Sequence, residues 1–148
     1  MSEWVLLLGG STGHGAATAK RLAQDGFGII AFHFDRGEAK KIAEETIAEV
    51  NDITKGNCHY FNTNAASEES MDKYIPEINE ITNGKPLKLL LHSIAFGTTT
   101  NFFGEKPVTQ RQMDMTVHVM GNSLLYWTQK LHQAKLLSKG SRIIGLTS

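Results

Sequence analysis

The sequence predicts an α/β fold in which helices cover both faces of a doubly wound parallel sheet. Two observations lead to this prediction. Short, nearly continuous apolar segments alternate with longer amphipathic segments along all 148 residues, a pattern typical of buried parallel strands joined by helices. A glycine-rich turn joins the first apolar segment to the first amphipathic one. We therefore expect three layers, α/β/α, with the strand order 3-2-1-4-5.

The first two strand–helix units are clear from the apolar pattern. Residues 4–8 are uninterruptedly apolar and end at two glycines, which predicts a buried strand followed by a turn. Residues 16–24 place alanine and leucine on one helical face and end at an Asp-Gly pair. Residues 28–34 then repeat the strand pattern, and residues 38–50 repeat the amphipathic helix.

The middle of the chain predicts a third unit and a fourth strand. Residues 57–61 are a strand candidate, and Ser67 is the expected N-cap of a helix that runs towards Ile81. Pro76 lies inside that helix and predicts a kink or a break, because proline lacks a backbone N–H. Residues 87–94 are the most apolar segment of the chain and predict the fourth strand.

The remaining residues predict a loop, a long helix and a last strand. Residues 96–107 have no regular period and predict a loop. Thr109 begins a helical pattern that runs to about Leu137, and Gln112 stands at the position that completes a capping box. A Lys-Gly pair ends that helix, and residues 142–146 predict the fifth strand.

The composition indicates one domain over residues 1–148 and excludes several classes. Fifteen basic residues balance fifteen acidic ones, so we expect no nucleic-acid or membrane partner, since both need a basic surface. Cys58 is the only cysteine, and the histidines show no close metal spacing, so no metal site is expected. The start lacks a signal-peptide pattern and no apolar run has membrane-spanning length, so we expect a cytoplasmic protein.

The glycine-rich turn predicts a dinucleotide site. The first N–H groups of a helix are unpaired and carry partial positive charge, so a pyrophosphate can bind there when no side chain blocks its approach. Glycines permit the tight turn and leave that approach open. The residues expected to hold the cofactor in this turn are Gly9, Ser11, Thr12, Gly13, His14 and Gly15.

Three other interpretations share these residues. Gly10 and Gly15 have the spacing of a P-loop, but Ala16 and Ala17 stand where that motif needs Lys and Ser or Thr, which excludes it. The turn also fits G-x-S-x-G, the nucleophile elbow of serine hydrolases, with Ser11 as nucleophile. That elbow follows a central strand deep in the chain rather than the first strand. The hydrolase and a plain glycine turn without ligand stay open as alternatives.

The spacing of Gly9, Gly13 and Gly15 resembles the G-x-x-x-G-x-G of the short-chain dehydrogenase/reductase family. The resemblance extends over all 148 residues and implies a Rossmann-type fold and an NAD(P)-dependent oxidoreductase. It places Asn64 and Ala65 beside the adenine, although Asn64 replaces the Asp that the family has at this position.

A second segment resembles one branch of this family. The segment Leu91-His92-Ser93-Ile94-Ala95 occupies the place of the family's Asn-Asn-Ala-Gly. Its His-Ser-Ile-Ala sequence is similar to that of enoyl-acyl-carrier-protein reductases. The resemblance implies that the residues lining the cofactor here are His92, Ser93, Ile94 and Ala95. It also implies that the substrate is an enoyl thioester or a carbonyl compound. The expected partner is therefore a small molecule or an acyl thioester. Phe96, Phe102 and Phe103 in the following loop would make the substrate side apolar.

The catalytic positions of the family carry over in part. The family's helix Asn falls on His118, and its catalytic Ser falls on Ser148. The family's Tyr-x-x-x-Lys follows that Ser, so the chain is interpreted as the front half of a longer enzyme. Tyr126 and Lys130 form a literal Tyr-x-x-x-Lys within the long helix, and we interpret them as packing or interface residues. By resemblance we expect a homodimer or homotetramer.

The end of the second strand bears on the choice of cofactor. An acid there binds the ribose 2′-OH of NAD, whereas Arg accepts the 2′-phosphate of NADP. The family's acidic position falls on His33, and Asp35 and Arg36 follow. This arrangement resembles NADP-using pteridine reductases, so NADP(H) is expected over NAD(H), with His33 and Arg36 as cofactor residues. A cofactor-binding module without turnover is the alternative to an enzyme.

Overall fold

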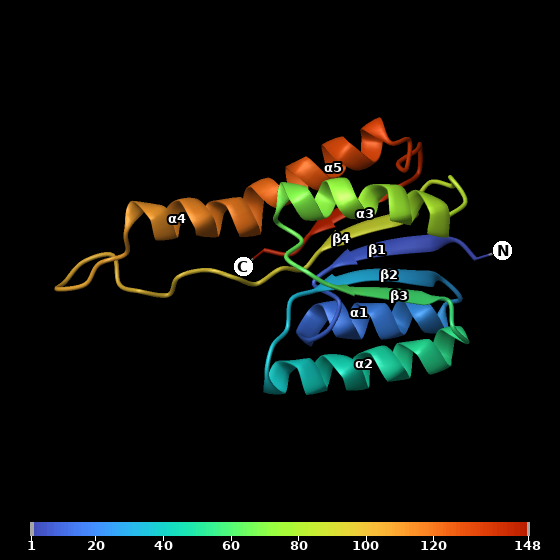
Figure 1. Ribbon diagram of the computed structural model, residues 1–148, viewed down its shortest axis with the longest axis horizontal. Coiled ribbons are helices and arrows are strands. Elements are labelled where there is room, and N and C mark those ends of the chain that lie inside the picture. The colour runs from blue at the N-terminus through green and yellow to red at the C-terminus, as the bar shows by residue number, and fades with distance from the viewer. Residues whose placement is uncertain (1, 148) are drawn as a thin grey trace.

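A computed structural model of the chain describes residues 2–147 as a five-stranded parallel sheet between helical layers (Figure 1). The strands are β1 (Trp4–Leu8), β2 (Gly28–His33), β3 (Cys58–Asn62), β4 (Leu89–His92) and β5 (Arg142–Gly145). Their order is β3-β2-β1-β4-β5 and every neighbouring pair is parallel. The predicted fold class and strand order are confirmed.

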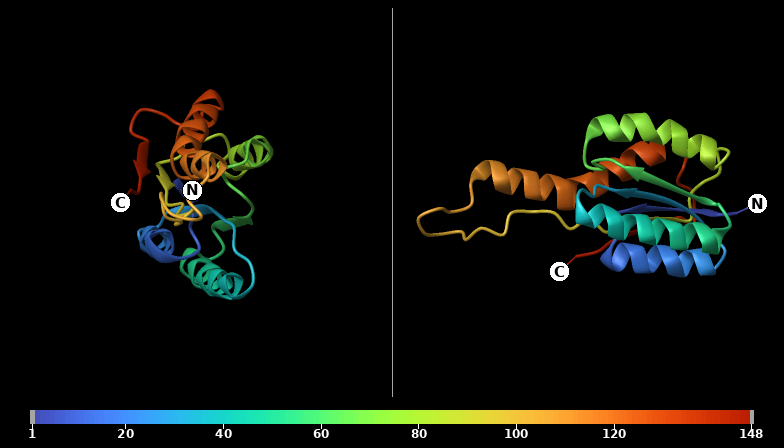
Figure 2. Two further views of the ribbon diagram at one scale, coloured as in Figure 1. Left: turned by 90° about the vertical axis from the view of Figure 1, so that its left-hand side faces the viewer. Right: turned by 60° about the horizontal axis from the view of Figure 1, so that its bottom comes forward.

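Helices cover both faces of the sheet. The helices are α1 (Gly13–Gln24), α2 (Glu38–Thr54), α3 (Glu68–Ile81), α4 (Gln110–Val117) and α5 (Ser123–Gln133), with a π-helical segment, η1 (His118–Asn122), between the last two. Helices α1 and α2 lie on one face, and α3 and α5 lie on the other (Figures 1 and 2). None of the helices in residues 2–147 is long and apolar enough to span a membrane.

Alternation along the strands builds two apolar cores. Leu7 of β1 points to one face of the sheet and packs with Ala19 and Val50 of α1 and α2. Leu6 points to the other face and packs in the cluster that contains Trp127 of α5. Both faces of the sheet are therefore buried, as the continuous apolar strand pattern predicted.

The helix boundaries differ from the predictions in informative ways. Helix α1 begins at Gly13 rather than at residue 16, so the end of the glycine turn is already helical. Ser67 caps α3 by accepting the Ser70 N–H, as predicted. The same helix runs without a break through Pro76, so the predicted alternative of a split helix is wrong.

The long helix predicted over residues 109–137 is interrupted. Thr109 and Gln112 form the predicted capping box at its start. The hydrogen-bond pattern then changes from α to π over His118–Asn122. It returns to α in the next helix, which ends at Gln133. Lys135 has a φ of 60°, a left-handed conformation that stops a helix before the last residues of the predicted span.

Candidate cofactor site

The carboxyl ends of β1 to β4 open into one cavity of about 500 Å³. Strand order explains the position, because parallel strands on either side of β1 end at the same edge of the sheet. The predicted site residues that line this cavity are Gly9, Ser11, Thr12, Gly13, His14, His33, Asn64, Ala65, Ser93, Ile94, Ala95 and His118. Residues from five separate segments, the four strand ends and the π-helical segment, thus converge on one space.

The glycine turn leaves the start of α1 open toward the cavity. Thr12 is the N-cap of α1, but its side chain makes no capping hydrogen bond. Gly13 has a φ of +55°, and a Cβ built there would meet no atom within 4 Å. At Gly15 a Cβ would lie 1.7 Å from the carbonyl oxygen of Gly9, so Gly15 serves the turn's packing and does not line the cavity.

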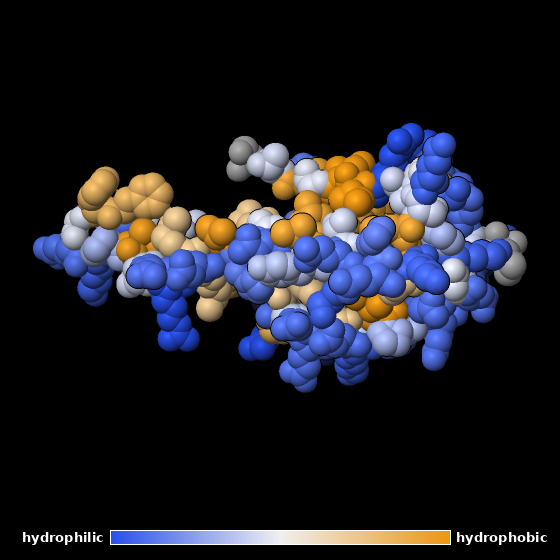
Figure 3. Space-filling view, turned by 90° about the horizontal axis from the view of Figure 1, so that it is seen from above, coloured by the Kyte–Doolittle hydropathy of each residue, from blue (hydrophilic) through white to orange (hydrophobic). Residues whose placement is uncertain are grey.

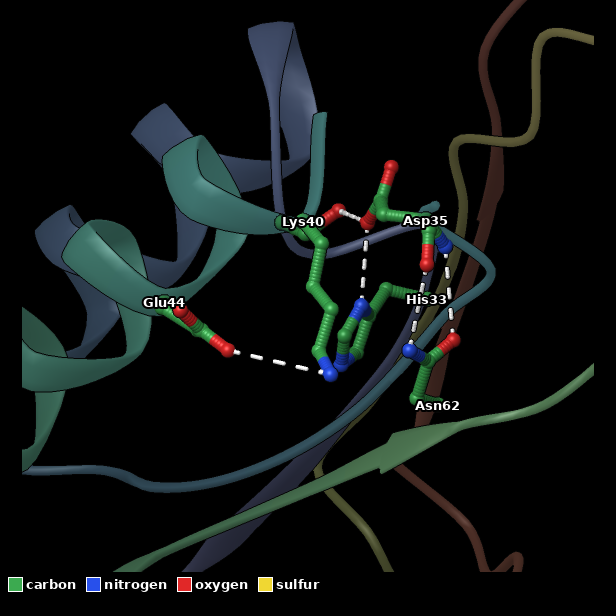
Figure 4. Close-up of polar contacts among 6 residues, drawn as sticks. His33, Asp35, Lys40, Glu44 and Asn62 are labelled. Atoms are coloured by element: carbon green, nitrogen blue, oxygen red, sulfur yellow. Dashed lines mark hydrogen bonds and ion pairs between the residues drawn. The ribbon is translucent and has the colours of Figure 1, made fainter. Parts of the chain in front are cut away.

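At the end of β2 an acid is held against the glycine turn (Figure 4). The Ser11 hydroxyl donates to Asp35 Oδ2 at 2.5 Å, and His33 Nδ1 lies 2.9 Å from the same oxygen. The Asn62 amide bonds both the N–H and the carbonyl of Asp35, at 3.3 and 3.2 Å. Because Ser11 donates directly to a carboxylate rather than to a histidine, its environment does not support the hydrolase interpretation.

Arg36 stands apart from this cavity. It is exposed, and its guanidinium lies 4.9 Å from the centre of the Phe34 ring. Phe34 and Asp35 line the cavity, whereas Arg36 does not. The structure therefore brings the acid of this turn, and not the base, to the cavity.

The segment after β3 is tied to the long helix by ring N–H groups. Trp127 Nε1 donates to the Ala65 carbonyl at 2.7 Å, and His118 Nε2 bonds the Ala66 carbonyl at 2.9 Å. The Asn64 side chain accepts the Ala66 N–H at 3.0 Å. These bonds fix Asn64 and Ala65 as one wall of the cavity.

The segment after β4 divides into a buried part and a lining part. His92 is 1% exposed, and its Nε2 lies 2.7 Å from the hydroxyl of Ser123. It does not line the cavity, whereas Ser93, Ile94 and Ala95 do. Desolvation lowers the pKa of His92. The side chain is thus buried behind the cavity rather than lining it.

Tyr126 and Lys130 lie outside the cofactor cavity. Both line a second cavity of about 450 Å³ between α3 and α5. Lys130 binds the Asp72 carboxylate and lies 3.6 Å from Glu68, and these partners raise its pKa, with the hydrogen bond to Asp72 the largest cause. The Lys130 ammonium thus binds acids of α3, which agrees with a packing role for Tyr126 and Lys130.

The apolar lining was only partly visible in the sequence. The cavity-lining residues that sequence reasoning did not select as site residues are Phe32, Phe34, Asp35, Thr63, Met115 and Val119. Phe96 lines the cavity, but Phe102 and Phe103 are 69% and 87% exposed and do not. They belong to an arm that extends beyond the sheet next to α4, and Figure 3 shows apolar side chains at its tip. These two residues therefore do not line this cavity, because the loop leads away from it.

Two remaining predictions concern Ser148 and metal. Ser148 lies outside the described residues. Within residues 2–147, no three or more His, Cys, Asp or Glu side chains are grouped so that they could hold a metal ion. The site is therefore built from backbone N–H groups, one fixed carboxylate and an apolar wall.

The sheet is doubly wound and parallel, and a glycine turn lies at its carboxyl edge. Beside it, the N-terminus of α1 has no side-chain cap. These features define a Rossmann-type α/β protein. A family model described as short chain dehydrogenase matches residues 3–148. The chain belongs to the short-chain dehydrogenase/reductase family, whose members bind NAD(P)(H) and are generally oxidoreductases.

Solved structures agree with this fold at low sequence identity. A short-chain dehydrogenase/reductase from Serratia marcescens is 22% identical with a TM-score of 0.79, and the match covers 99% of this chain and 55% of that one. A 3-oxoacyl-[acyl-carrier protein] reductase from Brucella melitensis is 18% identical with a TM-score of 0.72, covering 90% and 50%. A search of curated proteins gave no match. The chain thus spans about half the length of the solved structures that it resembles.

Proposed function

We propose that this chain supplies the cofactor half of an NAD(P)(H)-dependent oxidoreductase. The cavity that joins the open N-terminus of α1 to the ends of β2, β3 and β4 carries the proposal. The pyrophosphate would bind the N–H groups of Gly13 and His14, because the helix start there has no side-chain cap. The adenine would lie by Asn64, and the nicotinamide would lie along Ser93–Ala95.

The proposed substrate is an enoyl thioester or a related carbonyl compound. When bound, the cofactor would supply or accept the hydride. The His-Ser-Ile-Ala segment after β4 supports an enoyl thioester. The similar structure from Brucella melitensis is a 3-oxoacyl-[acyl-carrier protein] reductase, which supports the carbonyl alternative. Phe96, Met115 and Val119 give the cavity an apolar wall beside the nicotinamide side, which suits an acyl chain.

Two residues are proposed to act near the reacting atoms. His118 donates Nε2–H to the Ala66 carbonyl, which leaves Nδ1 as an acceptor that can hold a water molecule at the cavity wall. Ser148 would hydrogen-bond the developing oxyanion. A Tyr-x-x-x-Lys beyond Ser148 would supply the proton. A homodimer or homotetramer in the cytoplasm stays a prediction.

Calorimetric titration of this chain with NADH and with NADPH tests the cofactor site. Heat with either one supports the proposal, and no heat with a folded protein contradicts it. Covalent labelling of Ser11 by a fluorophosphonate would instead support the serine hydrolase, whose hydroxyl is here bonded to Asp35.

Turnover separates the enzyme from a binding module. A protein that extends this chain with the proposed Tyr-x-x-x-Lys should oxidise the reduced cofactor with crotonyl thioesters. Turnover with ketones alone would remove the enoyl assignment and leave a carbonyl reductase, and binding without any turnover would favour the module. An unchanged rate in Ser148→Ala would show that Ser148 is not catalytic.

A further inference from the structure

The long helix that lines the cavity changes register in one π-helical turn, η1 (His118–Asn122). In a continuous α-helix the Ser123 N–H would bond the carbonyl of Val119, four residues earlier. In η1 it bonds the His118 carbonyl instead, and the Ser123 hydroxyl donates to the Val119 carbonyl at 2.7 Å. The hydroxyl therefore replaces the backbone donor that the π-helical register removes from Val119.

A buried histidine of the sheet holds this serine. His92 Nε2 lies 2.7 Å from Ser123 Oγ, and both side chains are buried. The hydroxyl gives its one hydrogen to Val119, so His92 donates to it. The end of β4 is thus connected through two hydrogen bonds to a carbonyl of η1.

The register of η1 brings two ring donors to one side of the helix. His118 and Trp127 are nine residues apart, and each α-helical residue advances by ~100°, so a continuous α-helix would point them in opposite directions. The extra residue of η1 rotates the following segment back by ~100°. Consequently Trp127 donates to the Ala65 carbonyl and His118 to the adjacent Ala66 carbonyl.

We propose that His92 and Ser123 are positioning residues of the cofactor cavity. They sustain η1, and η1 places His118 on the cavity wall while Trp127 stays in the core. The same two ring donors hold residues 65–66, which form the wall proposed for the adenine. The inference rests on the proposed cofactor site, because it explains how a wall of that site is kept in place.

Loss of the Ser123 hydroxyl should affect the two ring donors differently. Without it, the Val119 carbonyl recovers a donor when the Ser123 N–H returns to it and the turn becomes α-helical. Trp127 is fully buried and keeps its segment in place, whereas no residue of α4 is buried. The segment before the turn should therefore rotate and take His118 away from its carbonyl. A purely structural role would weaken both donors together.

The first experiment follows the two accepting carbonyls by nuclear magnetic resonance of the chain without cofactor. In Ser123→Ala the ¹³C shift of the Ala66 carbonyl should move to its value in His118→Phe, which lacks the ring donor. The Ala65 carbonyl should keep its parent shift. An unchanged Ala66 carbonyl, or equal changes at both carbonyls, would overturn the proposal.

Thr128 supplies the matched control for both experiments. Its hydroxyl donates to the Leu124 carbonyl at 2.8 Å, four residues earlier, within regular α-helix. Thr128→Ala thus removes the same kind of bond without a π-helical turn, and it should leave both carbonyl shifts and the cofactor affinity unchanged. Effects equal to those of Ser123→Ala would show that η1 has no special role.

The second experiment measures NADH affinity by calorimetry and includes a rescue. Ser123→Ala should weaken binding about fivefold, which corresponds to about one hydrogen bond. Met120 is an exposed residue of η1 that lines neither cavity. Deleting it leaves His118 and Trp127 eight residues apart, which a continuous α-helix places within ~80° of each other. Added to Ser123→Ala, the deletion should restore the affinity to within about twofold of the parent, because the α-helix then reaches the native register.

The outcomes separate this proposal from the proposed function. A loss of affinity that the deletion does not restore in a folded variant, as judged by thermal melting, would overturn the role of η1. If the deletion variant does not fold, the carbonyl shifts of Ser123→Ala decide. A parent chain that binds no NADH would refute the proposed function, and the carbonyl shifts would still decide whether His92 and Ser123 position the wall.

Discussion

Two histidines end strands on either side of β1, and their surroundings give them opposite properties. His33 ends β2 at the cavity and bonds the carboxylate of Asp35. His92 ends β4 in the core and bonds the hydroxyl of Ser123. That hydroxyl donates its own hydrogen to the Val119 carbonyl at 2.7 Å, so His92 must be the donor to it.

The difference shows how an acceptor decides what a histidine does. Beside a cavity, His33 bonds a charged acceptor, the carboxylate of Asp35. Beside a hydroxyl in the core, a charged ring at His92 is penalised by desolvation, which lowers its pKa. The β2 end thus holds a carboxylate at the cavity, and the β4 end holds the π-helical wall that carries His118 and Val119.

The largest effect is expected from a substitution that fills the cavity beside the N-terminus of α1. Gly13→Leu should lower NADH affinity by about 100-fold or more, because its side chain would occupy the approach to the α1 N-terminus. Stability should fall by only about 1 kcal/mol, from the strained φ. Gly56→Leu is the matched control, with a φ of +90° and no atom within 4 Å of its Cβ. Gly56 does not line the cavity. Calorimetry that shows equal losses of NADH affinity in the two variants would contradict the proposed cofactor site.

The next prediction compares the two serines. Ser123→Ala should reduce the free energy of unfolding by about 1–3 kcal/mol, because it leaves the His92 donor buried without its acceptor. Ser11→Ala should cost less than about 1 kcal/mol, because Asp35 keeps the His33 bond and access to water. Chemical denaturation of both variants measures this. A greater loss in Ser11→Ala would reverse the comparison.

The pH dependence of stability tests the buried end. Because the pKa of His92 is lowered from its ordinary 6.5, the unfolded chain takes up a proton there before the native chain does. The stability contribution is complete above pH 6.5 and is lost as the pH falls from there toward the native pKa. In His92→Gln, denaturation at pH 5 to 8 should show a flatter slope. His132→Gln, at an exposed position on α5, should keep the parent slope. A slope unchanged in both variants would contradict the assignment.

The smallest effect is expected away from both ends. Tyr126→Phe and Lys130→Met should change cofactor affinity by less than about twofold, because this pair lines a different cavity and Lys130 binds acids of α3. A loss of tenfold or more by calorimetry would show that the Tyr-x-x-x-Lys of the long helix belongs to the site after all.

Local patterns predicted most of the elements and part of the site. The capping box of Thr109 and the cap at Ser67 were readable because their partners lie three residues away. The π-helical segment was not readable, because apolar periodicity does not distinguish it from α-helix. That Phe102 and Phe103 do not line the cavity was not readable either, because composition does not show in which direction a loop leaves the sheet.

The sequence by itself determined the alternation of strands and helices, the glycine turn and hence the sheet order, since periodicity and glycine spacing are local properties of the chain. Only the tertiary structure decided which side chains meet at the sheet edge. Asp35 depends on Ser11, 24 residues earlier, and His92 on Ser123, 31 residues later. Such pairs form only after parallel strands align in register and the helices pack on them, because a hydrogen bond requires its two atoms to lie about 3 Å apart.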